Sequence, residues 1–97
     1  MSEIDARYTR IDKTIDSVVG KVVLENAASY PRDESNLYCV STAGKIVWFA
    51  ERPDDGSHYS RVRFDDHGEK LLTYSTHGHA CELDLKTGKL LSQVSML

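Results

Sequence analysis

Apolar and polar residues alternate with a period of two along several short stretches of this chain. The clearest stretch is CELDL, residues 81–85, where the apolar side chains fall on one face and the two carboxylates on the other. This alternation is typical of a half-buried β-strand. RVRFD, residues 61–65, alternates in the same way, and after the turn DHGE a return strand is predicted over residues 70–74. The pattern therefore predicts short strands, with little sign of helix.

Two hairpins are predicted where a glycine separates runs of strand-forming residues. In the first, residues 37–40 and 45–50 flank the turn STAG, and Gly44 can adopt the positive φ of a tight turn. In the second, CELDL and residues 89–94 flank the turn KTG, in which Gly88 has the same position. The glycines are therefore expected to serve the backbone.

The strand pairs form an internal repeat. TAGKIVWF superposes on KTGKLLSQ, and VVGKVVLE, with strands expected at 15–19 and 21–24 around a turn at Gly20, corresponds to DHGEKLLTY. Four short strands per unit are typical of a β-propeller blade. We predict an all-β fold of two four-stranded antiparallel meander units, blade-like, that pack as a small sandwich or half-barrel. A single domain is expected over 1–97, with a frayed arm at 1–9, a first unit at 10–51 and a second unit at 58–97.

Composition and charge narrow the class of protein. The formal net charge of −3 argues against nucleic acid as the main partner, because nucleic-acid-binding proteins usually have a basic face. No apolar run approaches the roughly 18 residues of a membrane span, and the N-terminal stretch is too polar for a secretory signal. We therefore expect a cytoplasmic protein that binds no membrane and needs no cofactor. Cys39 and Cys81 are expected to be reduced, buried thiols, although a bridge between them stays open if their strands are neighbours.

Two resemblances suggest a family. LDLKTGKLL and LYCVSTAGKIVWFAE resemble the structural hairpin of PQQ-like and WD-like propeller repeats, although two such units cannot close a ring. RIDKTIDSVVGKVVLE, NLYCVSTAGKIVW and YSTHGHACELDLKTGKLL, within residues 10–95, look like parts of small bacterial β-proteins. Some of those proteins are immunity partners of polymorphic or contact-dependent growth-inhibition toxins. The resemblance implies a protein-binding module, not an enzyme, that neutralises a toxin domain such as a basic nuclease. The alternatives are a structural or homo-oligomeric β-repeat protein, or a small metal- or ligand-binding domain.

Aromatic and arginine residues suggest where a partner would bind. In HYSRVRF, Tyr59, Arg61 and Arg63 are expected on one strand face, and Tyr and Arg are enriched at interface hot spots. The same strip suits a phosphate or a nucleotide, or is an ordinary solvent face. Trp48 and its neighbour Phe49 point to opposite faces, so one is expected in the core and the other exposed beside the adjacent strand.

Acidic loops complete the predicted binding surface. Their carboxylates would steer a cationic partner towards the chain, although Asp is also an ordinary turn residue. The candidate partner-binding residues are Tyr38, Trp48, Asp54, Asp55, Tyr59, Arg61, Arg63, Asp65 and Asp66.

A metal site is the weaker alternative. On an extended strand His77, His79 and Cys81 would project from one face, which suits zinc or another borderline metal. Cys81 begins a core face, however, and the two histidines flank a glycine at the polar entrance of the strand. His58 and His67 lie near carboxylates, but the stretch DDHGE has the composition of a turn rather than of an acid–base pair.

Overall fold

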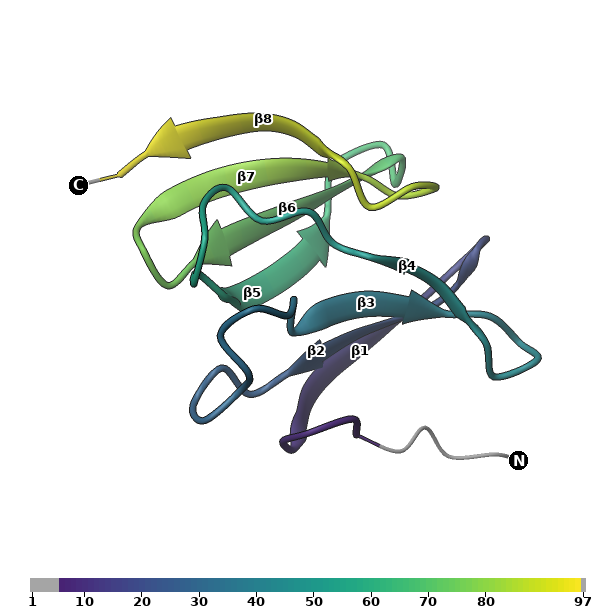
Figure 1. Cartoon of the computed structure of the whole chain (residues 1–97). Coiled ribbons are helices and arrows are strands. Elements are labelled where there is room, and N and C mark those ends of the chain that lie inside the picture. Colours follow the sequence, from purple (N-terminus) through teal and green to yellow (C-terminus); the bar gives the residue numbers. More distant parts are fainter. Residues whose placement is uncertain (1–5, 97) are drawn as a thin grey trace.

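The chain forms two antiparallel β-sheets. A computed structural model describes residues 6–96, and within this range there is no helix long and apolar enough to span a membrane. Each sheet has four strands in chain order, which confirms the predicted all-β fold of two meander units (Figure 1). The strands are β1 (Ile11–Ser17), β2 (Gly20–Glu25), β3 (Leu37–Val40), β4 (Ile46–Phe49), β5 (Tyr59–Phe64), β6 (Lys70–Ser75), β7 (His79–Asp84) and β8 (Leu90–Ser95).

The two predicted hairpin turns are confirmed, and their glycines differ in what surrounds them. Gly44 and Gly88 have φ angles of 81° and 74°, in the left-handed region that favours glycine. Apart from its neighbours in the chain, no residue lies within 4 Å of a Cβ built at Gly44, whereas at Gly88 the Cβ would lie 2.5 Å from the Trp48 ring. Gly88 is therefore required both for its backbone and for the indole that packs against it.

The hairpin of β1 and β2 differs from its prediction. β1 begins at Ile11 instead of residue 15, the turn lies at Val18 and Val19, and Gly20 is the first residue of β2. The early part of β1 was missed because Asp12 and the two residues after it are polar and exposed. Edge strands often carry such residues, which blur the apolar alternation.

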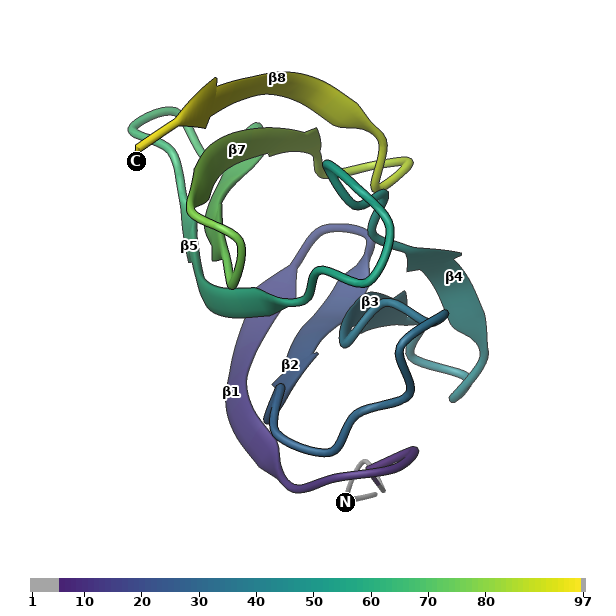
Figure 2. The ribbon, with the colours of Figure 1, turned by 60° about the vertical axis from the view of Figure 1, so that its left-hand side comes forward.

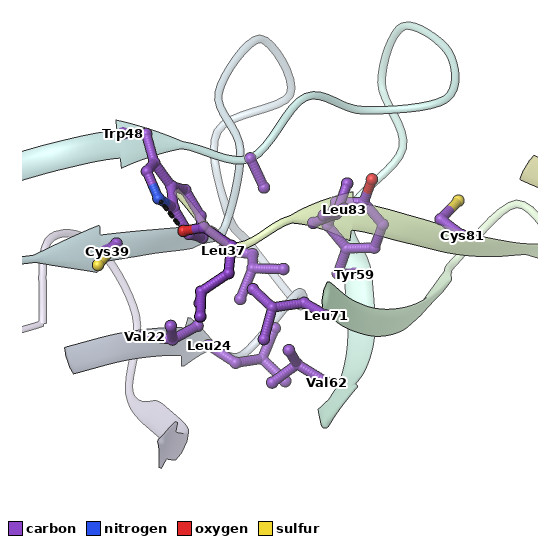
Figure 3. Close-up of a cluster of buried hydrophobic side chains, with 12 residues drawn as sticks. Val22, Leu24, Leu37, Cys39, Trp48, Tyr59, Val62, Leu71, Cys81 and Leu83 are labelled. Atoms are coloured by element: carbon purple, nitrogen blue, oxygen red, sulfur yellow. Dashed lines mark hydrogen bonds between the residues drawn. The ribbon is translucent and has the colours of Figure 1, made fainter. Parts of the chain in front are cut away.

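A hydrophobic core lies between the two sheets, which do not close into a barrel (Figure 3). It includes a polar contact, because the Trp48 indole N–H donates a 2.8 Å hydrogen bond to the carbonyl of Leu85. This bond ties the end of the first sheet to the last hairpin of the second. The buried residues of the core are Val22, Leu24, Leu37, Cys39, Trp48, Ala50, Tyr59, Val62, Leu71, Cys81, Leu83 and Leu85.

Asn36 joins the two sheets through its side-chain amide. Its Nδ2 donates to the carbonyls of Glu25 and Tyr59, each at 2.7 Å, and its Oδ1 accepts the N–H of Tyr59 at 2.8 Å. The side chain is fully buried. It therefore acts as a piece of backbone between the end of β2 and the start of β5, and satisfies groups that would otherwise be buried without partners.

The segment before β1 is held by the buried carboxylate of Glu25. The backbone N–H groups of Arg7, Tyr8 and Thr9 donate to it at 2.6, 3.0 and 3.0 Å, and the Tyr38 hydroxyl donates as well. Residues 7–9 are thus fixed, in contrast to the frayed arm expected over 1–9, while residues 1–5 lie outside the described range. No local sequence pattern indicates this contact, because three of its four donors are backbone groups and the fourth is a hydroxyl from another strand.

Candidate functional site

A groove of about 760 Å³ follows the second sheet and is lined from all four of its strands. Two cross-strand rows supply much of the lining, and both lie on the sheet face opposite to the core residues Leu71 and Leu83. Because successive side chains on a strand point to opposite faces, the residues between the core residues must lie on this outer face. The rows are Arg61, Tyr74, Ala80 and Val94, and Arg63, Leu72, Glu82 and Ser92. The buried residues Leu24, Val62, Thr73 and Cys81 also line the groove.

The two arginines are the free charges of this groove. Arg61 and Arg63 are both exposed, and neither forms an ion pair with a carboxylate in the described part of the chain. Arg63 donates one long hydrogen bond of 3.4 Å to the Phe64 carbonyl. Glu82, in the same row as Arg63, instead accepts a 2.8 Å hydrogen bond from the Ser92 hydroxyl. The guanidinium groups are therefore available to an external acceptor.

The groove extends to the place where the two sheets meet. β1 lies beside β5 there (Figure 2), and the Lys13 ammonium donates a 2.8 Å hydrogen bond to the Val62 carbonyl. Asp12 also lines the groove, but Arg10 and Asn26 occupy its carboxylate at 3.2 and 3.1 Å. Lys13 and Asp12 are thus both hydrogen-bonded within the chain, in contrast to the two arginines.

Three of the predicted partner-binding aromatics are in the interior. Tyr38, Trp48 and Tyr59 are 1%, 7% and 1% exposed, so the expectation that they contact a partner at the surface is wrong. Tyr59 does not share a face with Arg61 because a β-bulge between these residues shifts the register of β5. Burial raises the pKa of Tyr59, whose hydroxyl donates a 2.5 Å hydrogen bond to the Glu51 carbonyl. Of the neighbours Trp48 and Phe49 on β4, it is Phe49 that is exposed.

The predicted carboxylates do not form one patch. Asp54 lies in the loop before β5 and contacts His77 at 3.0 Å, whereas Asp65 and Asp66 lie in the β5–β6 turn, at the other end of the sheet. A hydrogen bond from Ser57 lowers the pKa of Asp54, and His77 adds to this effect. Asp55 and Asp66 are exposed. The acidic residues therefore flank the second sheet at its two ends.

Asp65 has a structural task within its turn. Its Oδ1 accepts the backbone N–H groups of Glu69 and Lys70 at 3.0 and 3.2 Å. Burial raises the pKa of Asp65, but the backbone hydrogen bonds outweigh this effect and lower it. This carboxylate therefore stabilises the β5–β6 turn.

A family model matches residues 3–94 of the sequence. The chain belongs to the family described as "Domain of unknown function (DUF7957)". Comparisons with curated proteins and with solved structures found no match. The family therefore covers both sheets of the fold and leaves its activity to be argued from the site.

The residues considered for a metal site are not arranged to bind one. Within residues 6–96 no group of three or more His, Cys, Asp or Glu side chains could hold a metal ion. His77 lies in the β6–β7 turn against Asp54, and the backbone N–H of His79 donates to the Ser75 hydroxyl at 3.0 Å. Cys81 is 3% exposed in the core, and burial raises the pKa of its thiol. The side chains of His77, His79 and Cys81 thus do not converge on one point where a metal could bind.

Sequence reasoning missed the apolar part of the exposed surface. Leu72 and Tyr74 line the groove between the arginines and β7. Leu91 and Val94 on β8 are 51% and 60% exposed. Alternation along β6 would have placed Leu72 and Tyr74 on the face opposite the core, because Leu71, which directly precedes Leu72, is a core residue.

Proposed function

We propose that this chain is a non-catalytic protein-binding module that neutralises a toxin domain by covering its active surface. The groove face of the second sheet is the binding face. The observation that carries the proposal is the pair Arg61 and Arg63, two exposed guanidinium groups without carboxylate partners beside the half-buried Leu72 and Tyr74.

This combination is what a protein interface needs. Arg and Tyr are enriched among the residues that contribute most to binding energy, and an apolar floor lets them be desolvated by a partner. The Arg61 guanidinium lies in the same cross-strand row as Tyr74 and Val94, so one partner segment can contact charge and apolar surface together.

The toxin as partner is supported by the resemblance of residues 10–95 to small bacterial β-proteins that include immunity proteins. The exposed carboxylates of Asp55 and Asp66, at opposite ends of the sheet, favour a partner with basic surface around the contact. We place this activity in the cytoplasm, where an immunity protein would meet an incoming toxin.

The test compares two double variants with the same change of charge. Arg61→Glu with Arg63→Glu reverses the groove, and Lys45→Glu with Lys86→Glu reverses two exposed lysines in hairpin turns. Tagged chains are used to capture a stoichiometric partner from the source cell. That partner is then expressed alone and together with each variant, and growth of the host is measured.

The proposal expects that the partner alone stops growth and that the wild-type chain and the lysine variant restore it. The arginine variant should fail to restore growth while its circular dichroism and unfolding midpoint match those of the lysine variant. If the captured partner is harmless, or if the arginine variant protects as well as the wild type, the proposal is wrong.

A further inference from the structure

We propose that the chain forms a two-fold symmetric homodimer in which β8 pairs antiparallel with β8 of a second copy. The exposed edge of β8 carries this inference, and it does not depend on the function proposed above.

The edge strands of the two sheets differ in their protection. Soluble proteins usually place charged residues on exposed edges, because an uncharged edge is a template for another strand. β1 carries Asp12, Lys13 and Asp16, and β5 carries Arg61 and Arg63. β8, with the sequence LLSQVS, has no charged residue and no proline. It is therefore the long edge that lacks the usual protection.

The side chains of β8 are also unusually apolar for an exposed strand. Leu91 and Val94 are 51% and 60% exposed, and Met96 just beyond the strand is 59% exposed. Apolar side chains on a strand edge gain free energy when a second strand covers their flanks. Both the backbone and the side chains of β8 thus favour pairing.

The other uncharged edge, β4, is less suited to this role. It has four residues, against six in β8. The backbone just after it is already bonded, because the Glu51 N–H donates to the Gly88 carbonyl at 2.8 Å. The Glu51 carboxylate accepts the Leu90 N–H at 2.7 Å, so the first residue of β8 is bonded at this corner too, and the edge proposed for pairing begins after it.

The register of β7 and β8 shows which backbone groups face outward. The Met96 N–H donates to the Gly78 carbonyl at 2.8 Å, and regular pairing continues from His79 with Ser95 to Glu82 with Ser92. Hydrogen-bonded and non-hydrogen-bonded pairs alternate along an antiparallel ladder. The N–H and C=O of Gln93 therefore point away from β7, towards the open edge.

A second copy of the chain fits this edge better than a charged partner strand. Antiparallel pairing about a two-fold axis at Gln93 places Gln93 opposite its own symmetry mate and pairs the residues on either side reciprocally, Ser92 with Val94 of the second copy. On β1 or β5 this would oppose like charges, whereas on β8 it opposes only neutral side chains. The axis is perpendicular to the sheet at the junction, so both grooves lie on one side of a continuous sheet, with Val94 of each copy next to the junction.

The experiment measures the mass of the full chain by sedimentation velocity from micromolar to submillimolar concentration. We expect a monomer–dimer equilibrium for the wild type. Gln93→Lys and Gln93→Glu should each weaken dimerisation by about tenfold or more, because like charges face each other across the axis. An equimolar mixture of the two variants should dimerise again. Val47→Lys, on the exposed edge of β4, is the matched control and should dimerise like the wild type.

Several outcomes would overturn the homodimer. A wild type that stays monomeric at submillimolar concentration refutes it directly. Loss of the dimer with Val47→Lys but not with the Gln93 variants would move the interface to β4. Failure of the mixture to restore a dimer, with both variants folded by circular dichroism, would show that residue 93 does not meet its symmetry mate.

Discussion

Replacing Glu25 by Gln should destabilise the fold, because the carboxylate accepts more hydrogen bonds than an amide can. Its Oε1 accepts the N–H groups of Tyr8 and Thr9, and its Oε2 accepts the N–H of Arg7 and the Tyr38 hydroxyl. In Gln one of these oxygens becomes an NH₂ group, so at least one backbone N–H faces another donor, and an NH₂ in place of Oε2 also forces the Tyr38 hydroxyl to turn and accept. A donor left without a partner costs about 1–3 kcal/mol. Since the backbone donors are only partly buried, we expect a loss of about 2–4 kcal/mol in the free energy of unfolding.

The pH dependence of the free energy of unfolding tests the same contacts of Glu25 independently. Burial raises the pKa of Glu25, but the hydrogen bonds from Tyr38 and from the backbone of Arg7, Thr9 and Tyr8 outweigh it and lower the pKa. The unfolded chain therefore takes up this proton at a higher pH than the folded chain. The stabilisation is fully present above the ordinary Glu pKa and is lost as the pH falls through the lowered folded value.

Urea unfolding followed by the fluorescence of the single Trp48 would measure both effects. The difference between the wild type and Glu25→Gln should be largest at pH 7 and should shrink in acid, when the wild-type carboxyl is protonated too. Glu69→Gln, an exposed site in the β5–β6 turn, is the matched control and should change stability by less than about 0.5 kcal/mol. A Glu25→Gln variant as stable as that control at pH 7 would refute the reasoning.

Two further substitutions test the contacts that join the sheets. Gly88→Ala should lower the free energy of unfolding by about 2–4 kcal/mol, through positive φ and the clash with the indole, whereas Gly44→Ala should cost only about 1 kcal/mol, for φ alone. Equal losses in urea unfolding would show that the indole moves aside freely. Asn36→Ala should cost about 3 kcal/mol or more, because it leaves buried backbone groups of both sheets without partners. A thermal unfolding midpoint unchanged from the wild type would contradict this.

The sequence predicted the fold well where the chemistry is local. A glycine with positive φ between two apolar runs specifies a hairpin by itself, and both Gly44 and Gly88 have that conformation. Four hairpin-linked strands in each half then leave little choice but a meander. Contacts between distant segments, such as those of Glu25 and Asn36, are set by tertiary packing, and no local pattern reports them.

The candidate site was harder to predict, because it depends on which side of each strand faces the core. A single bulge in β5 separates Tyr59 from Arg61, and one register step reverses every side chain that follows. Trp48 and Phe49 are adjacent and similar in hydrophobicity, so alternation alone does not say which is buried. The packing of Trp48 against Gly88 decides it, and that contact spans two sheets.

The two proposed surfaces share β8, but alternation lets each be tested without the other. Ser92 and Val94 line the groove, so the Gln93 side chain between them points to the opposite face. A charge at residue 93 should therefore weaken the dimer and leave partner capture intact, whereas reversing Arg61 and Arg63 on β5 should weaken partner capture and leave the dimer intact. If the Gln93 variants lose both properties while remaining folded, the partner binds only the paired form, and the two grooves on one side of the joined sheet act as a single surface.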